Sequence, residues 1–314
     1  HFEKMLYDNA QFISLASKYY KISNDCYFKK KIIQTIEFIN NNFLKKSNNL
    51  LGSAYDADSE GVEGKYYVFS YNELKHIKNL DKYFKIKPEG NWEGKIILQE
   101  ITPPPDEILN ELKKIRLPRK KPFFDNKTQL DLNCLWVSAL INAHYALPEQ
   151  KYLNLAESYY KDLDKEYLSK QLYHCNSNSI VFLEDYAYAI SMLLDLYEQT
   201  LKPFYQIKAK ELSKEVIEKF YLKDKAIFQK NKKDLKDLFH NAVDISDHTI
   251  PNGNSIMLIN FTRLGLKKEG KELADSLNGY LNVYKTLMIS SIKSIDFFNE
   301  FMSGKNCNET GCDI

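Results

Sequence analysis

The sequence predicts a mainly α-helical protein in which pairs of helices pack side by side. Apolar residues recur at helical spacing over most of the 314 residues. The helices also alternate in character, because an apolar helix rich in Ala, Leu and Ile is followed by an amphipathic one rich in Lys and Glu. A helix that is apolar on nearly every side belongs inside, whereas an amphipathic helix has a face suited to water. We therefore expect an inner and an outer layer of helices.

Nine segments carry the helical spacing. They are 5–20, 27–44, 132–147, 152–168, 183–199, 205–222, 254–264, 269–283 and 286–302. Most of them fall into a repeat of one inner and one outer helix followed by a short β-prone piece, seen at 8–52, 133–182, 185–230 and 253–283. Such pairs build either an open solenoid or a closed double ring. The uneven connections favour the closed ring, since regular solenoids keep a more constant period.

Two stretches interrupt the repeat. Residues 52–70 predict a small β-hairpin, with the acidic segment "YDADSEGVEGKYY" as its turn and "KYYVFS" as its second strand. Residues 71–130 contain a short helix and later three prolines, after which Asp106 and Glu107 open another helix. We interpret 71–130 as an excursion from the ring, so that 1–314 forms a single domain.

Composition excludes several classes of function. The 44 basic and 42 acidic residues nearly cancel, so no basic face indicates nucleic acid or an anionic membrane as a partner. No apolar run approaches the roughly 20 residues of a membrane helix, and no secretory signal opens the chain. The five cysteines are an odd number and lie mostly far apart, which fits a reducing cytoplasm. CxxC, HExxH, GxGxxG and P-loop spacings are absent from the sequence, so we expect neither a metal nor a cofactor.

The acidic segment has three possible roles. Asp56, Asp58, Glu60 and Gly61 match the first half of an EF-hand calcium loop, but Tyr67 stands where the closing Glu is required. Calcium binding is therefore disfavoured. A pair of catalytic carboxylates and a solvated turn both remain open.

Polar residues mark the starts of the predicted inner helices. If these helices all run the same way, their N-terminal ends and the loops that enter them form one rim. The rim would gather Asp8, Asn9, Asp125, Lys127, Asn133, Asp185, Asp247, Asn252 and Asn254, together with the acidic segment. Carboxylates and amides pair with hydroxyl groups, and aromatic rings stack on sugar faces, so we expect a sugar-like small molecule there.

A purely structural role is the competing interpretation for many of these residues. Asp and Asn are preferred N-cap residues, which favours capping for Asn133, Asn252 and Asn254 and leaves Asp8 and Asp185 open. The rings of Tyr7, Trp92, Phe123 and Tyr186 suit either a ligand or the core. Among the histidines, His1 lies beside Glu3, Lys4 and Asp8 in the sequence and could carry a proton, and we expect His248 to be structural. The other histidines, including His174, belong to no cluster that the sequence shows.

Several blocks resemble the YyaL-like proteins, which are bacterial relatives of the spermatogenesis-associated thioredoxin-domain proteins. The blocks are "HFEKMLYDNA" (1–10), "DADSEGVEGKYYVFS" (56–70), "GNWEGKIIL" (90–98), "FLEDYAYAISMLLDLYE" (182–198) and "PNGNS" (251–255). The resemblance implies a thioredoxin-like domain followed by an (α/α)6 toroid similar to sugar epimerases and six-hairpin glycosidases. This chain would then be a toroid that is incomplete at its N-terminus, with a small β-hairpin insertion and without the thioredoxin-like domain.

The chain departs from that family in two blocks. The family's Asp-Asp-Lys reads Asp125, Asn126 and Lys127 here, and its Thr-Ser-Trp-Asn is replaced by the run from Leu130 to Asn133. The Pro-Ser-Gly-Asn-Ser block has Asn252 at its second position. The final "CNETGC" keeps a C-x4-C spacing, which suits a metal clasp, a redox pair or two exposed thiols.

Two hypotheses on function follow. The first is a glycosidase-like or epimerase-like site that uses Asp8, Asp58 and Asp185 as carboxylates, with His1 as a proton carrier. Residues expected to bind the substrate are Glu3, Lys4, Asn9, Asp56, Glu60, Trp92, Lys127, Asn133, Tyr186, Asn252 and Asn254. The second hypothesis is a non-catalytic module that binds ligands or proteins for an attached thioredoxin-like domain.

Overall fold

The structure, a computed structural model, describes residues 2–45, 47–169, 171–175, 180–232 and 242–304, and the backbone of 307–308 and 311–312. The chain divides into two compact units. The small unit comprises His1–Met5 and Ser53–Asn126, and the helical unit comprises Leu6–Gly52 and Lys127–Ile314. The predicted excursion at 71–130 falls almost wholly within the small unit.

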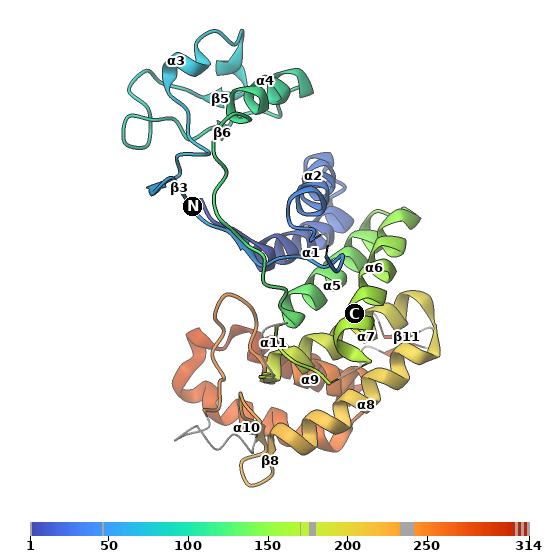
Figure 1. The fold of residues 1–314 in the computed structure, drawn as a ribbon. Helices are drawn as coiled ribbons and strands as arrows, with labels where there is room; N and C mark the ends of the chain where they lie inside the picture. The colour runs from blue at the N-terminus through green and yellow to red at the C-terminus, as the bar shows by residue number, and fades with distance from the viewer. Residues whose placement is uncertain are drawn as a thin grey trace. The chain divides into compact units, whose positions relative to one another are not determined.

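Inner helices follow one another through the helical unit. They are α1 (Leu6–Ser23), α5 (Leu130–Ala146), α7 (Leu183–Thr200), α9 (Gly253–Arg263) and α11 (Ile289–Ser303). Each packs against the next one in this order, as Figure 1 lets the reader follow. The middle helices are buried nearly all round, with Trp136 of α5 and Ile190 of α7 fully enclosed. This explains why their sequences are apolar on every side.

Outer helices cover this layer. They are α2 (Cys26–Asn42), α6 (Gln150–Leu163, followed by a π turn at Asp164–Leu168), α8 (Pro203–Phe220) and α10 (Lys267–Tyr284). Each packs on the inner helix that precedes it in the chain. Their buried residues recur at helical spacing on one face, as Leu273, Ala274 and Leu277 do in α10. The predicted two-layer arrangement and the helix positions are thus confirmed.

The inner helices run in the same direction. At their N-terminal ends, Ser255 of α9 hydrogen-bonds Ser291 of α11, with 2.8 Å between the hydroxyl oxygens. At their C-terminal ends, Arg263 of α9 pairs with Asp195 of α7 at 2.7 Å. The predicted gathering of N-terminal ends at one rim is therefore present within the helical unit.

Two buried asparagines fasten the connecting segments to the inner helices. The side-chain oxygen of Asn133 accepts from the backbone N–H of Leu51 at 2.9 Å, and its amide nitrogen donates to the Leu51 carbonyl at 3.1 Å. Asn254 makes the same pair of bonds with Phe228, at 2.9 and 3.0 Å. We call these two arrangements the asparagine latches. Each satisfies a buried backbone donor and acceptor in a segment that connects two helices.

The small unit is built from short strands and two helices. Strands β1 (Lys4–Met5), β2 (Ala54–Tyr55) and β7 (Phe124–Asp125) form an antiparallel sheet in the order β1-β2-β7. Strand β5 (Phe84–Lys85) pairs with β6 (Gln99–Glu100), and α3 (Tyr71–Leu74), a 3-10 turn (Leu80–Lys82) and α4 (Asp106–Arg116) complete the unit. Its core consists of Phe69, Leu74, Ile77, Leu80, Phe84, Ile96 and Leu112.

The predicted hairpin at 52–70 is shorter than expected. Strand β3 (Asp58–Ser59) pairs with β4 (Val62–Glu63), so the turn is Glu60–Gly61. The segment "KYYVFS" contributes a single bridge, between Phe69 and Ile96. The reason is that Val68 and Phe69 are both buried, so the segment enters the core of the small unit.

The remaining short elements lie in the helical unit. Strand β8 (Tyr221–Leu222) pairs with β9 (Ile227–Phe228), β10 (Cys307–Asn308) pairs with β11 (Gly311–Cys312), and a 3-10 turn spans Lys285–Leu287. Within the described part of the chain, no helix combines the length and apolar character needed to cross a lipid bilayer.

Candidate functional site

The segment before α7 lies across the start of α5. The backbone N–H of Leu130, the first residue of α5, donates to the His174 carbonyl at 2.9 Å. A bridge between Gln129 and Cys175 continues this pairing. The N–H of His174 in turn donates to the Ile180 carbonyl at 2.7 Å. These backbone bonds hold the His174 side chain between the first turns of α5 and α7.

His174 contacts a carboxylate from each of those two helices. Its Nδ1 lies 2.9 Å from Asp185 Oδ1 and 3.9 Å from Asp131 Oδ1. Asp185 is completely buried and also accepts from the backbone N–H of Phe182 at 2.9 Å, which caps α7. The edge of the Phe182 ring covers the imidazole, with 5.0 Å between ring centroids. We call Asp131, His174 and Asp185 the Asp-His-Asp cluster.

The Asp131 carboxyl is poised to exchange a proton near neutral pH. Burial raises the pKa of Asp131 to about 7, and the neighbouring Asp185 carboxylate acts in the same direction. The positive charge of His174 and a hydrogen bond from the Leu132 N–H partly oppose this shift. A carboxyl group whose pKa is near the working pH can both give and take a proton.

His174 is held in its charged form. Burial alone would lower its pKa, but the hydrogen bond and charge of Asp185, and then the charge of Asp131, outweigh burial and raise the pKa of His174 to about 9. At neutral pH the ring is therefore an imidazolium that donates to Asp185. The amide of Gln129 lies 2.9 Å from the other ring nitrogen and can present its oxygen to the charged ring or its nitrogen to the neutral ring.

Further polar contacts continue the rim toward α9 and α11. Burial raises the pKa of Glu184, the neighbour of Asp185. Lys230 pairs with Asp244 at 3.1 Å, and His248 lies 3.5 Å from the same carboxylate. Asp247 accepts from the backbone N–H of Ser290 at 2.7 Å and from the Asn252 side chain at 2.9 Å. The last contacts bind the loop before α9 to the start of α11.

The Asp-His-Asp cluster also has the donor set of a cation site. Its three ligand atoms lie within 4.8 Å of one another, and among the described residues it is the one group of His, Cys, Asp and Glu that converges in this way. Carboxylate oxygen and imidazole nitrogen suit divalent metals. A metal would have to replace the hydrogen bond between His174 and Asp185, so the donor set fits only with that bond broken.

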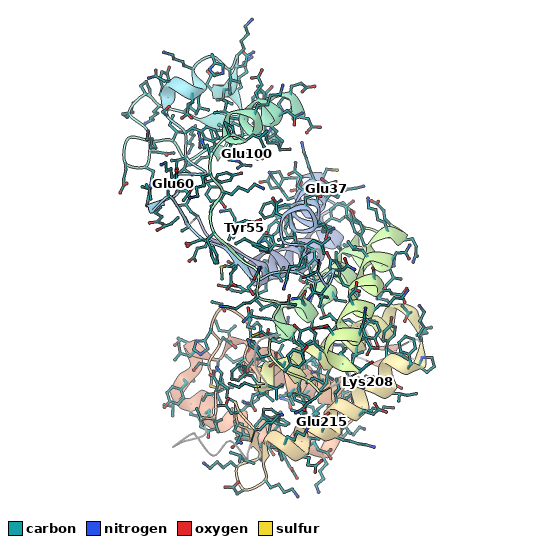
Figure 2. All side chains as sticks on the ribbon, in the orientation of Figure 1. Glu37, Tyr55, Glu60, Glu100, Lys208 and Glu215 are labelled. Carbon is teal, nitrogen blue, oxygen red and sulfur yellow. The ribbon has the colours of Figure 1, made fainter. Side chains whose placement is uncertain are left out.

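Four predicted ligand-binding residues have structural contacts in the helical unit. Asn133 and Asn254 form the asparagine latches. Asn252 caps α9 by accepting from the Ser255 N–H at 3.0 Å. Tyr186 is buried, and its hydroxyl donates to Glu215 of α8, labelled in Figure 2, at 2.6 Å.

The other predicted residues of the helical unit lie nearer to solvent. Asp8 in the first turn of α1 is exposed, Asn9 is half-buried, and Lys127 before α5 is exposed. Asp185 is part of the Asp-His-Asp cluster. His1 lies outside the described residues.

Six predicted residues belong to the small unit. Asp56, Asp58 and Glu60 are exposed, and Glu60, labelled in Figure 2, pairs with Lys65 at 2.8 Å. Glu3 is exposed, Lys4 is half-buried, and the partly exposed Trp92 ring packs edge-on against Phe2 with 5.6 Å between centroids. The predicted joint site of the acidic segment with Asp8 and Asp185 stays a prediction.

Sequence reasoning missed Asp131 and His174. Asp131 carried a usable signal, since it is an acid in the first turn of a helix that is otherwise apolar on all sides. No sequence pattern indicated His174, because its position depends on backbone pairing of its segment with Gln129 and Leu130, more than forty residues earlier.

Comparisons of the sequence with known proteins give distant relatives. No protein-family model matches the chain. An uncharacterised protein of Caenorhabditis elegans, B0495.5, is 26% identical over an alignment 341 residues long, gaps included, which covers 88% of this chain and 46% of the relative. Human spermatogenesis-associated protein 20 is 26% identical over 261 residues, covering 63% of this chain and 33% of that protein. The chain thus spans between a third and a half of the length of these curated relatives.

Solved structures share the fold. The GH76 α-mannanase BT2949 of Bacteroides thetaiotaomicron is similar with a TM-score of 0.57 at 11% identity, covering 96% of this chain and 70% of its own. The cellobiose 2-epimerase of Spirochaeta thermophila has a TM-score of 0.55 at 9% identity, covering 90% and 61%. A sugar epimerase from a ruminal bacterium has a TM-score of 0.55 at 12% identity, covering 98% and 77%. The chain therefore has the predicted six-hairpin glycosidase-like α/α toroid fold, with small antiparallel sheets added.

Proposed function

We propose that the helical unit binds a polyhydroxylated, sugar-like ligand at the rim and that Asp131 exchanges a proton with it. The observation that carries this proposal is the Asp-His-Asp cluster, in which two carboxylates flank one imidazolium. Structural clusters of this kind are costly to bury, because two like charges must share one partner. Perturbed acids of this kind concentrate at functional sites.

The three residues have different parts in this proposal. Asp131 and His174 retain some exposure, whereas Asp185 has none. Asp185 is thus closed to a ligand, and of the two residues that retain exposure we assign proton exchange to Asp131, whose pKa is raised to about 7. His174 and Asp185 act as positioning residues, because the imidazolium stabilises the ionised form of Asp131 and Asp185 holds the ring in place. Asp8, near the start of α1, is proposed as a ligand contact.

The likeness to sugar-processing proteins supports the ligand class. A cellobiose 2-epimerase and an α-mannanase have this fold, although their low identity to this chain carries no residue roles across. The Asn, Asp, Lys and His side chains at the rim provide both hydrogen-bond donors and acceptors, as sugar hydroxyls require.

A binding module without catalysis is the second candidate. The specific observation in its favour is burial, since the Asp131 residue is only 7% exposed. In that case the cluster fixes the shape of the rim, and the rim presents a ligand or a protein client to an attached thioredoxin-like domain. The two candidates differ in whether the bound ligand is converted.

Proton transfer and binding can be measured on the whole chain with sugars as probes. Cellobiose, mannose and α-1,6-mannobiose would be incubated with the protein in D2O and followed by proton NMR. Saturation transfer reports binding, and deuterium at carbon 2 or a new reducing end reports conversion. Asp131→Asn should lower conversion by about 10²- to 10⁴-fold and leave binding intact. Asp275→Asn, on the exposed face of α10, is the matched control.

Each outcome decides between the candidates. Unchanged conversion in Asp131→Asn would overturn the role of Asp131, and binding without conversion in the parent chain would support the binding module. Absence of binding by all three sugars would overturn the ligand class. Conversion that is lost with a chelator and restored by a divalent cation would assign the cluster to a metal instead of to proton transfer.

A further inference from the structure

The small unit contains a cleft of its own. Its volume is about 340 Å³, within the range of small-molecule sites. Apolar side chains in or against the unit's core line it, among them Phe84 from β5 and Leu109 and Leu112 from α4. All of its lining residues belong to the small unit, so it is distinct from the rim.

Three cations line the same apolar cleft. They are Lys4 from β1 and Lys113 and Arg116 from the last turn of α4. Within the described residues, none of the three forms an ion pair with a carboxylate. The cleft is therefore lined by apolar side chains together with these three cations.

Arg119 shows what a structural arginine looks like in this unit. It lies one turn beyond Arg116 and pairs with Glu73 at 2.8 Å. It also donates to the carbonyls of Val68 at 2.6 Å and Tyr66 at 3.1 Å. Arg119 thus has its charge balanced by Glu73 and donates to two carbonyls. Arg116 instead lies against the Tyr66 ring, 5.3 Å from its centroid, and has no carboxylate partner in the part of the chain that the structure describes.

Lys4 is held in the cleft with no carboxylate partner among the residues that the structure describes. Its Nζ donates to the Phe2 carbonyl at 2.9 Å and lies 4.2 Å from the centroid of the Tyr67 ring. Burial lowers the pKa of Lys4, and the positive charge of Arg116 lowers it further. A like-charged pair beside an apolar wall is relieved by an anion, because the anion restores the missing counter-charge.

We propose that this cleft binds a small organic anion, with its carboxylate or phosphate between Lys4 and Arg116 and its apolar body against Phe84, Leu109 and Leu112. Carboxylates and phosphates share the chemistry that Arg recognises, a planar or tetrahedral set of oxygens. The proposal does not depend on sugar binding at the rim.

Three probes that share one ring system distinguish the contribution of charge to binding from the contribution of apolar contact. They are 2-naphthoate, 2-naphthyl phosphate and the uncharged 2-naphthalenemethanol, titrated into the whole chain by calorimetry. At least one of the two anions should bind 10-fold or more tightly than the alcohol. The tighter anion identifies the preferred oxygen group. Backbone NMR shifts should map to Phe84 and Leu112.

Variants on one helix provide the matched comparison. Arg116→Met should weaken binding of the anions about 10-fold and leave the alcohol unchanged, and Lys113→Met is the second variant should Arg116→Met fail to fold. Lys114→Met removes an identical charge from the same turn but does not line the cleft, so it should change nothing. Equal binding of the alcohol and both anions, or equal losses in Arg116→Met and Lys114→Met, would overturn the proposal.

Discussion

The acidic segment of the small unit and the Asp-His-Asp cluster of the helical unit contain the same kinds of acid in opposite surroundings. Asp56, Asp58 and Glu60 are exposed, and Glu60 meets a lysine in solvent. Asp131 and Asp185 are buried around one imidazole. The acidic segment, which has the highest density of acids that the sequence analysis singled out, thus has solvated carboxylates. Burial and a shared partner, more than the density of acids along the chain, create groups with unusual pKa values.

Removal of Asp185 should have the largest effect on stability. Asp185→Ala leaves the charged His174 without its hydrogen-bond partner and the Phe182 N–H without its acceptor. Breaking a buried pair in this way costs about 3–5 kcal/mol. Urea unfolding followed by circular dichroism measures the change. Asp185→Asn keeps one of the two hydrogen bonds and should lose less, and an equal loss in both variants would contradict the assignment.

The next largest effect is the dependence of stability on pH. Folded-state pKa values that lie above the unfolded ones mean that the folded protein binds more protons, so stability falls as pH rises. Asp131 contributes this fall between about pH 4 and 7 and His174 between about pH 6.5 and 9. We expect the free energy of unfolding to fall steadily across that window.

A single substitution separates the two steps of this titration. Asp131→Asn should flatten the fall in stability between pH 4 and 7 and leave most of the fall between pH 6.5 and 9. Unfolding free energies at pH 5, 7 and 9 for both proteins provide the check. A parent chain whose stability rises over this range would refute the proposed protonation states.

Loss of an asparagine latch should have an intermediate effect. Asn133→Ala removes a buried amide and leaves the N–H and carbonyl of Leu51 without their partners, which costs about 2 kcal/mol. The thermal midpoint should fall, and hydrogen exchange at Leu51 should speed up. Asn133→Asp keeps an oxygen that accepts from the Leu51 N–H but loses the amide nitrogen that donates to the Leu51 carbonyl, so it tests the two hydrogen bonds separately. Unaltered exchange at Leu51 would argue against the latch.

The smallest effect is expected in the acidic segment. Asp58→Asn changes an exposed side chain, so stability should move by less than about 0.5 kcal/mol. Its dependence on pH should match that of the parent chain. A change in stability comparable to that of Asp185→Asn would mean that a partner or ligand buries Asp58 in solution, and that the two groups of acids have similar surroundings after all.

The helices and their layers could be predicted because the helical spacing of apolar residues depends only on residues that are close in the sequence. Alternation of all-apolar and amphipathic segments was enough to assign α5 and α7 to the inside and α6 and α8 to the outside. The gathering of N-terminal ends followed from that alternation. The uneven connections favoured a closed ring, the resemblance implied the six-hairpin type of toroid, and the solved structures confirm the fold.

The Asp-His-Asp cluster could be predicted only in part. Asp185 stood out as an acid at the start of an apolar helix. The contact of His174 with it depends on how the segment before α7 pairs with Gln129, and no local pattern encodes such pairing. The latches are hidden for the same reason, because Leu51 and Asn133 are 82 residues apart.

The asparagine latches have a consequence for how such a protein can change over evolutionary time. The first latch holds the chain at Leu51, just before the second segment of the small unit begins at Ser53. Helix α5 starts at Leu130, soon after that segment ends at Asn126. Both junctions of the inserted segment are therefore anchored to the same helix. The segment between these two junctions can therefore accept insertions, deletions or a new function while the packing of the surrounding helices is preserved.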